Sequence, residues 1–248
     1  MSLTQNQIKT ALSAMLKQIH DTDTFKLAVC VPSQENVKTD FAVSLFSMAM
    51  HLGMEKVKLP WVQKHAVMLF NRKSSIIHSM RHMLVVDAIE WGATHILFVD
   101  SDQTFPADVV HRLAAHDKMM VGANIVTKQF PAQFCATGLN GKRVITRPSS
   151  TGLEEVNVCG TGLVLINTKV FDGLSLPYFL MPYNEATRTF MGEDVYFSNI
   201  VRARGHQVFI DHDVSKVVGH VGQMEFNFTH AGEVDKDGYA SIYAADSV

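Results

Sequence analysis

The chain has 248 residues, of which 47% are hydrophobic and 19% are charged, and its formal net charge is -2. This composition supports one sizeable hydrophobic core and argues against a disordered chain. The nearly balanced charge excludes a global basic field that would draw the protein to nucleic acid or anionic lipid. The three cysteines are widely spaced and form no C-x-x-C pair, so we expect reduced core cysteines and no zinc or redox site.

The N-terminus is predicted to be a helical extension. Apolar residues recur at helical spacing between Leu3 and His20, without the uninterrupted apolar stretch of a signal peptide. No run of about 18 apolar residues occurs in the sequence, so we expect no membrane span and a cytoplasmic protein. The predicted organisation is an N-terminal flank at 1–24, a main domain at 25–222 and a polar C-terminal tail at 223–248.

Strands and helices alternate in the first half of the main domain. Continuous apolar runs such as FKLAVCV are typical of strands buried in a parallel sheet. The alternation predicts a mainly parallel sheet with helices on both faces. The predicted strands are Phe25–Val31, Ala66–Phe70, His95–Val99 and Met119–Ala123, and the predicted helices are Asp40–Leu52, Ser74–Trp91 and one that starts at Pro106.

The second half is predicted to contain shorter, mixed strands and one long helix. Turn residues separate the apolar segments more often here than in the first half. The predicted strands are Ala132–Thr137, Val144–Thr146, Leu153–Val158, Gly162–Ile166, Gln207–Ile210 and Ser215–Val218, and the helix is Asp194–Arg204. A proline-punctuated segment, Leu180–Met191, is predicted to be either a mobile lid or a plain surface loop.

Two aspartates, Asp100 and Asp102, directly follow the predicted strand HILFV. Ligands in α/β sheets bind outside the carboxyl ends of the strands. Two carboxylates at such a place can share a Mg²⁺ or Mn²⁺ ion, which would neutralise the phosphates of a nucleoside diphosphate. The spacing alone leaves an alternative, in which Asp102 caps the following helix and Asp100 is an ordinary loop residue.

Two further segments are candidates for the same site. Glu193 and Asp194 stand at the start of the predicted helix, where carboxylates either stabilise the helix N-terminus or serve as a general base. His220, between Gly219 and Val221, is either a packed residue or a metal ligand. Spacing alone does not decide between these readings.

Ordered blocks between Phe25 and about Gly222 resemble the GT-A glycosyltransferases, especially the compact family-2-like enzymes of bacteria and phages. The blocks are VCVPSQEN, SSIIHSMRHMLVV, ATHILFVDSDQTFPADVVHRL, VGANIVTK, CGTGLVLINTKVF, MGEDVYFSNIVRARGHQVFID and VVGHVG. The resemblance implies a GT-A fold, with a Rossmann-like mixed sheet flanked by helices. It also implies metal-dependent transfer of a sugar, usually a hexose, from a UDP-sugar or similar donor to an acceptor hydroxyl.

The resemblance also assigns roles to individual residues. Asp194 would be the catalytic carboxylate, assisted by Glu193, with an inverting displacement favoured over a retaining one. Mn²⁺ or Mg²⁺ would be bound by Asp100, Asp102 and His220. The nucleotide-sugar donor would be bound by Pro32, Ser33, Glu35, Arg81, Asp100, Ser101, Lys128, Gly160, Thr161 and Gly162. The sequence departs from the family pattern at Glu35-Asn36, where the family has Asn-Glu, and at Arg81-His82, where it has Arg-Asn.

Other functions stay open at this point. A sugar-nucleotide pyrophosphorylase would carry a glycine-rich phosphate loop near the first strand, and residues Val31–Thr39 contain no glycine. A catalytically inactive module that binds nucleotide-sugars is a third reading. The acceptor, whether a glycan, a lipid-linked sugar, a protein or a modified DNA base, and the oligomeric state are open as well.

Overall fold

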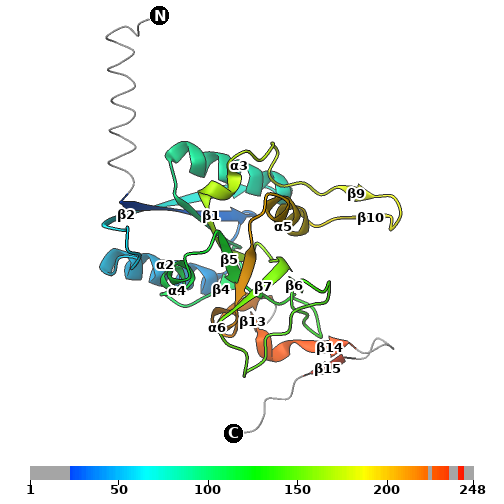
Figure 1. Cartoon of the computed structure of the whole chain (residues 1–248). Coiled ribbons are helices and arrows are strands. Elements are labelled where there is room, and N and C mark those ends of the chain that lie inside the picture. The colour runs from blue at the N-terminus through cyan, green and yellow to red at the C-terminus, as the bar shows by residue number, and fades with distance from the viewer. Residues whose placement is uncertain (1–22, 223–224, 235–239, 243–248) are drawn as a thin grey trace, which may run out of the picture.

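The computed structural model describes residues 23–222, 225–234 and 240–242. The helix predicted between Leu3 and His20 lies outside these residues. An eight-stranded sheet with the order β2-β1-β3-β8-β5-β11-β7-β6 crosses the molecule (Figure 1). Its strands are β1 (Thr24–Ser33), β2 (Lys64–Lys73), β3 (His95–Val99), β5 (Met120–Ala123), β6 (Thr137–Gly138), β7 (Leu153–Val158), β8 (Leu163–Asn167) and β11 (Val208–Asp211).

The sheet is mixed and mainly parallel, as predicted. β1 pairs in parallel with β2 and β3, and β5 pairs in parallel with β11. β8 runs antiparallel between β3 and β5, and β7 runs antiparallel to β11. The alternating first half of the sequence therefore forms the parallel part of the sheet, and the second half supplies the reversed strands.

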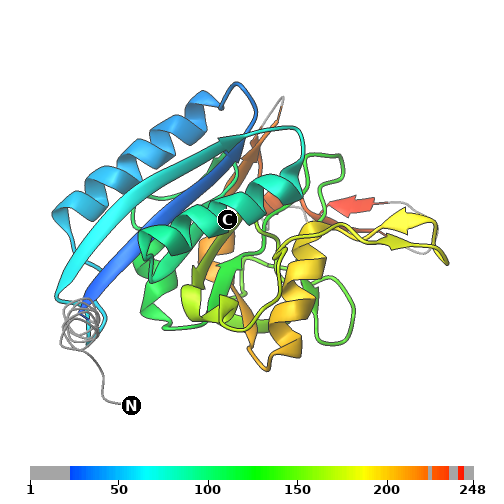
Figure 2. The same ribbon diagram turned by 90° about the horizontal axis from the view of Figure 1, so that it is seen from above.

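Helices cover both faces of the sheet because its buried strands are apolar on both sides. In β1, Leu27 and Val29 belong to one buried cluster, whereas Ala28 and Cys30 belong to the opposite one. The first cluster contains residues of α2, α4 and α6 on one face, and the second contains residues of α3 and α5 on the other (Figure 2). The helices are α2 (Thr39–Met54), α3 (Ile77–Trp91), α4 (Val109–Ala115), α5 (Glu193–Ala203) and α6 (His212–Ser215).

Smaller sheets stand at the edges of the main one. The three-stranded sheet β13-β12-β4 pairs His220 with Gln103 and so joins the C-terminal part of the chain to the segment after β3. The remaining short elements are β4 (Gln103–Thr104), β9 (Tyr183–Asn184), β10 (Thr189–Phe190), β12 (Gly219–Val221), β13 (Glu225–Phe226), β14 (Gly232–Val234), β15 (Ala240–Ile242) and the 3₁₀ turns η1 (Thr168–Phe171) and η2 (Phe228–His230).

Several predicted boundaries were wrong. The helix expected at Pro106 begins at Val109, whose N–H donates to the Pro106 carbonyl across a preceding turn. Ser215, expected in a strand, is the last residue of helix α6. That helix forms because the Asp211 side chain caps its N-terminus by accepting hydrogen bonds from two backbone N–H groups.

Two expected strands of the second half are largely absent. Of the segment Ala132–Thr137, only Thr137 belongs to a named strand, β6. The segment Val144–Thr146 is no named strand. Its Val144 N–H donates to the Ala136 carbonyl, but the Val144 carbonyl accepts from the Asn124 side chain and the Thr146 hydroxyl pairs with His212.

The segment predicted as a lid or loop is a β-hairpin. β9 and β10 pair antiparallel and project from the body of the molecule (Figures 1 and 2). Tyr183 and Phe190 on these strands are exposed, with their ring centroids 5.2 Å apart. Across the described part of the chain, no helix is long and apolar enough to cross a membrane.

Candidate functional site

A cleft of about 590 Å³ lies where β1 and β3 end, within the roughly 300–1,000 Å³ of common ligand sites. It gathers most of the residues that were predicted to bind the donor and the metal. Its lining comprises Pro32, Ser33, Gln34, Asn36, Val37, Lys38, Ser74, Ser75, Ile77, Met80, Asp100, Ser101, Asp102, Lys128 and His220.

Backbone hydrogen bonds fix the Asp-Ser-Asp segment at the floor of this cleft. The Asp100 N–H donates to the Gly162 carbonyl at 2.9 Å, which continues the pairing of β3 with β8. The Ser101 carbonyl accepts from the Lys38 N–H at 3.1 Å, and the Asp102 carbonyl accepts from the Val221 N–H at 2.7 Å. The segment is therefore tied both to the loop after β1 and to the strand that carries His220.

Asp102 and His220 face each other. His220 Nε2 lies 3.3 Å from Asp102 Oδ1, and His220 Nδ1 lies 2.7 Å from the Val126 carbonyl oxygen. Because a carbonyl only accepts, Nδ1 carries a proton. Nε2 donates to the Asp102 carboxylate when the ring is protonated, and it offers a lone pair to a cation when the ring is neutral. Metal-bound histidines are commonly held in this way, by a hydrogen bond from the other ring nitrogen to a carbonyl.

Lys128 completes the surroundings of Asp102. Its ammonium group forms an ion pair with Asp102 Oδ2. Burial favours the protonated carboxyl, but the hydrogen bonds to His220 and Lys128 outweigh it and lower the pKa of Asp102 to about 2. Asp102 is thus a carboxylate at neutral pH, with a positive charge already beside it.

The geometry fits a divalent cation held by two protein side chains. Asp102 and His220 present an oxygen and a nitrogen close enough to bind one ion, and phosphate oxygens of a ligand would fill the other positions. Asp100 is nearby, but one of its oxygens accepts a hydrogen bond from Arg81. Among the residues placed in the structure, no group of three His, Cys, Asp or Glu side chains is arranged to hold a metal ion.

Arg81 does not line the cleft, although it was predicted to contact the nucleotide. Its side chain is 4% exposed and lies behind Asp100. Nη2 donates to Asp100 Oδ1 at 2.9 Å, Nη1 donates to the Thr161 carbonyl at 3.0 Å, and Nε lies 3.4 Å from Glu193 Oε1. Burial raises the pKa of Asp100, and the Arg81 guanidinium opposes that rise.

The segment of Gly160, Thr161 and Gly162, between β7 and β8, packs against the back of the site. Thr161 is buried, and a Cβ at Gly160 would meet Cys135 and Ile125 at 3.4 Å. None of the three residues lines the cleft. The segment therefore supports the site from behind and does not form its surface.

Replacing Gly162 with alanine is expected to weaken both the fold and the site. A Cβ at this position would lie 2.6 Å from Ile125 Cδ1 and 3.0 Å from Asp100 Oδ2, so buried neighbours must move. Overpacking of this kind costs about 1–3 kcal/mol. Urea unfolding measures the loss. Gly141→Ala, at an exposed turn glycine with a positive φ and open space around it, separates steric crowding from backbone strain. An unchanged Gly162→Ala stability would contradict the close packing.

Glu193 and Asp194 form the first turn of α5, after Gly192. Asp194 Oδ1 accepts from the Val195 N–H at 2.7 Å, so the predicted helix-stabilising role is present. Burial, and then the neighbouring Glu193 carboxylate, raise the pKa of Asp194. A carboxylate with a raised pKa near a cleft is a candidate general base. Neither residue lines the cleft itself; the Arg81–Asp100 pair connects them to it.

Besides Arg81 and the segment of Gly160, Thr161 and Gly162, one more residue predicted to bind the donor does not line the cleft, and sequence reasoning missed several that do. Glu35 is exposed and does not line the cleft, whereas its neighbours Gln34 and Asn36 do. Ser74 and Ser75 were not predicted, although β2 runs parallel to β1 and so ends at the same edge of the sheet. The end of the predicted second strand at this shared edge could have indicated both serines. In the structure, the Ser74 N–H donates to the Ser33 carbonyl at 3.2 Å.

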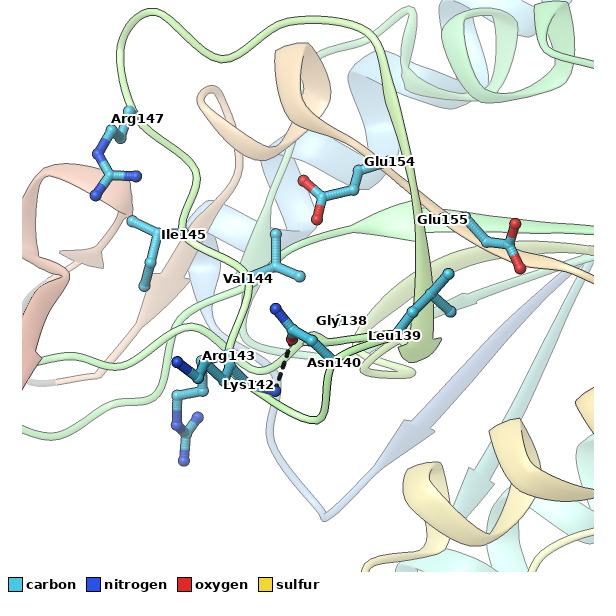
Figure 3. A pocket seen from close by; sticks show the side chains of 10 residues that line it. All are labelled: Gly138, Leu139, Asn140, Lys142, Arg143, Val144, Ile145, Arg147, Glu154 and Glu155. Carbon is cyan, nitrogen blue, oxygen red and sulfur yellow. Dashed lines mark hydrogen bonds between the residues drawn. The ribbon is translucent and has the colours of Figure 1, made fainter.

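A second cavity, of about 480 Å³, lies beside β6 and β7 and contains none of the predicted site residues (Figure 3). Glu154 binds His212 at 3.0 Å, and Glu155 binds Arg202 at 3.0 Å. The two acidic side chains that line this second cavity are thus paired with other residues of the protein. The candidate functional site is therefore the cleft at the ends of β1 and β3.

No protein-family model and no curated protein matches the sequence. The fold is similar to that of A197 from STIV, with a TM-score of 0.52 and 13% identity, covering 90% of this chain and 96% of that one. At this identity the likeness shows the fold alone. The mixed sheet flanked by helices is compatible with a Rossmann-like α/β fold.

A nucleoside-diphosphate-sugar pyrophosphorylase from Vibrio cholerae RC9 gives a lower TM-score of 0.36, with 13% identity. That match covers 75% of this chain and 72% of the pyrophosphorylase. A TM-score of 0.36 does not establish a common fold.

Proposed function

We propose that this protein is a metal-dependent glycosyltransferase of the GT-A type that uses a nucleotide-diphosphate sugar. The observation that carries the proposal is the pairing of Asp102 with His220 at the floor of the cleft. The Val126 carbonyl fixes the ring so that His220 Nε2 faces the carboxylate at 3.3 Å. A carboxylate and an imidazole at the ends of buried strands, below a cleft, suit a cation that grips a diphosphate.

The chain's own residues would bind the donor from two sides. Ser33 at the end of β1, with Asn36 and Lys38 on the loop after it, would face the nucleoside, and a UDP-sugar is the proposed donor. Lys128 would leave Asp102 for a phosphate oxygen when the donor enters, because both groups are anions within its reach. A bound Mn²⁺ or Mg²⁺ would act as Lewis acid for the departing diphosphate.

Asp194 would act as the general base. It would accept the proton of the acceptor hydroxyl as that oxygen attacks the anomeric carbon, with inversion of configuration. Its raised pKa makes it a better proton acceptor than an exposed aspartate. The acceptor class stays open among a glycan, a protein and a modified nucleobase.

Two alternatives compete with this proposal. A pyrophosphorylase would need phosphate-binding backbone N–H groups after the first strand. Here that loop presents the side chains of Gln34, Asn36 and Lys38, and it has no glycine. An inactive binding module would keep Asp102 and His220 but would have no use for Asp194 with a raised pKa.

Incubation with a panel of UDP- and GDP-sugars is expected to release nucleoside diphosphate slowly, by transfer to water, when Mn²⁺ is present. Chelation with EDTA should stop the release. Nucleoside triphosphate formed from a nucleotide-sugar and pyrophosphate would instead identify a pyrophosphorylase. Tight nucleotide binding with no release, even with candidate acceptors added, would identify an inactive module, and no binding of any nucleotide would refute all three.

A further inference from the structure

One buried guanidinium connects three separate segments of the candidate site. Arg81 lies on α3, and its partners are Asp100 at the end of β3, the Thr161 carbonyl before β8 and Glu193 at the start of α5. Burying a charge is costly unless it is paired, and here the two carboxylates supply the pairing. The three contacts therefore hold three parts of the chain at fixed positions relative to one charge.

The chemistry of this contact requires arginine. A guanidinium presents five N–H donors in a rigid plane, whereas an ammonium is a compact point charge. Nη1 and Nη2 make hydrogen bonds of 3.0 and 2.9 Å. Nε faces Glu193 at 3.4 Å and has no hydrogen bond. The link to α5 is thus ionic and the loosest of the three, so it is the one most open to change when the site is filled.

The same contact distinguishes the two neighbouring acids of α5. The Glu193 carboxylate points at Arg81, and its side chain is 15% exposed. Asp194 forms no direct ion pair with Arg81, although the Arg81 charge lies near enough to act on it, and its carboxylate is bonded to backbone N–H groups of the first turn of its own helix, including Val195 N–H. The Glu193 carboxylate therefore pairs with a buried side chain, whereas Asp194 uses its Oδ1 for the hydrogen bond from the Val195 N–H.

We infer that Arg81 is a positioning residue that couples the donor side of the site to the catalytic carboxylate. This inference rests on the proposed function. Arg81 holds Asp100 beside the metal-binding pair on one side and anchors Glu193 on the other, which sets the position of Asp194. Glu193 is accordingly an anchor and not a second base. Breaking the Arg81–Glu193 contact should then slow transfer without weakening donor binding.

Glu193→Gln tests this separation, since it removes the charge and keeps the shape. We expect its melting temperature to fall, because the buried Arg81 loses one of the two carboxylates that pair with it, whereas its UDP affinity with Mn²⁺ and its donor KM should stay close to wild type below that temperature. The kcat should fall about 10- to 100-fold, because small displacements of a catalytic group cost rates of that order. Glu90→Gln, at an exposed carboxylate on α3, is the matched control and should leave kcat unchanged.

Arg81→Lys provides the second variant, because it keeps the charge but loses the planar fork. We expect it to fold, to bind UDP at least about tenfold more weakly and to lose kcat as well, since it disturbs both sides. An unchanged kcat in Glu193→Gln would overturn the inference. Equal losses of UDP affinity and kcat in that variant would also overturn it, by making Glu193 part of the binding surface. Failure of the wild type to bind UDP with Mn²⁺ would instead refute the proposed function.

Discussion

Asp102→Asn is expected to abolish the metal-dependent part of nucleotide binding. The substitution keeps the size of the side chain but removes the charge that faces His220 Nε2 and Lys128. A neutral amide is a poor ligand for a hard cation, so the UDP dissociation constant measured with Mn²⁺ should rise by about 100-fold. Losing a residue that only supports a metal ligand already costs about 10- to 100-fold. Titration calorimetry with and without Mn²⁺ measures the change.

The metal-free measurement is the informative control. In EDTA, Asp102→Asn should bind UDP about as well as the wild type, because the freed Lys128 ammonium is then available to a phosphate. Asp108→Asn, on an aspartate that pairs with Arg112 outside the cleft, should change neither constant. If Asp102→Asn lost the same affinity in Mn²⁺ and in EDTA, Asp102 would act on the nucleotide without a cation.

The parts of the fold that local sequence patterns determine were predictable. Strand β3 occupies His95–Val99 as predicted, because the apolar run Ile96–Val99 lies between a helix-ending glycine and the Asp-Ser-Asp segment. Gly92 ends α3 in the left-handed conformation, which glycine adopts without strain. The predicted burial of Cys30 and Cys159 is also confirmed, for the same reason: both sit in apolar runs.

Features that depend on distant partners were not predictable. Helix α6 is capped by the Asp211 side chain, which accepts hydrogen bonds from the Asp213 and Val214 N–H groups. This local bonding overrides the extended structure that the apolar residues after Ser215 indicated. Likewise, nothing local distinguishes Arg81 from an exposed arginine of an amphipathic helix. Its burial follows only from the approach of Asp100 and Glu193, 19 and 112 residues further along the chain.

The candidate site also contains features that were predictable and features that were not. Asp102 and His220 were predicted to meet, and the pairing of β12 with β4 brings them to 3.3 Å. Asp100 was predicted to share the metal, but the structure gives one of its oxygens to Arg81. The family resemblance thus indicated which side chains gather, whereas the direction in which each carboxylate points depended on packing.

Asp194→Asn is expected to reduce glycosyl transfer by at least 100-fold while UDP binding with Mn²⁺ stays within about twofold of the wild type. General-base catalysis contributes about 10²- to 10⁴-fold, and the amide cannot accept the acceptor proton. The cleft that holds the nucleotide is not lined by Asp194, so donor affinity should be preserved. Single-turnover transfer and calorimetry on the same preparation separate the two effects.

The pH dependence of transfer tests the same assignment independently. A base works only when ionised, and burial with the adjacent Glu193 charge raises the pKa of Asp194. The wild-type rate should therefore fall as the pH is lowered, and it should do so at a pH above the ordinary aspartate range. Glu193→Gln removes the neighbouring negative charge, so this fall should move to lower pH. A shift to higher pH, or an Asp194→Asn variant that keeps the same acid limb at a reduced rate, would show that another group is the base.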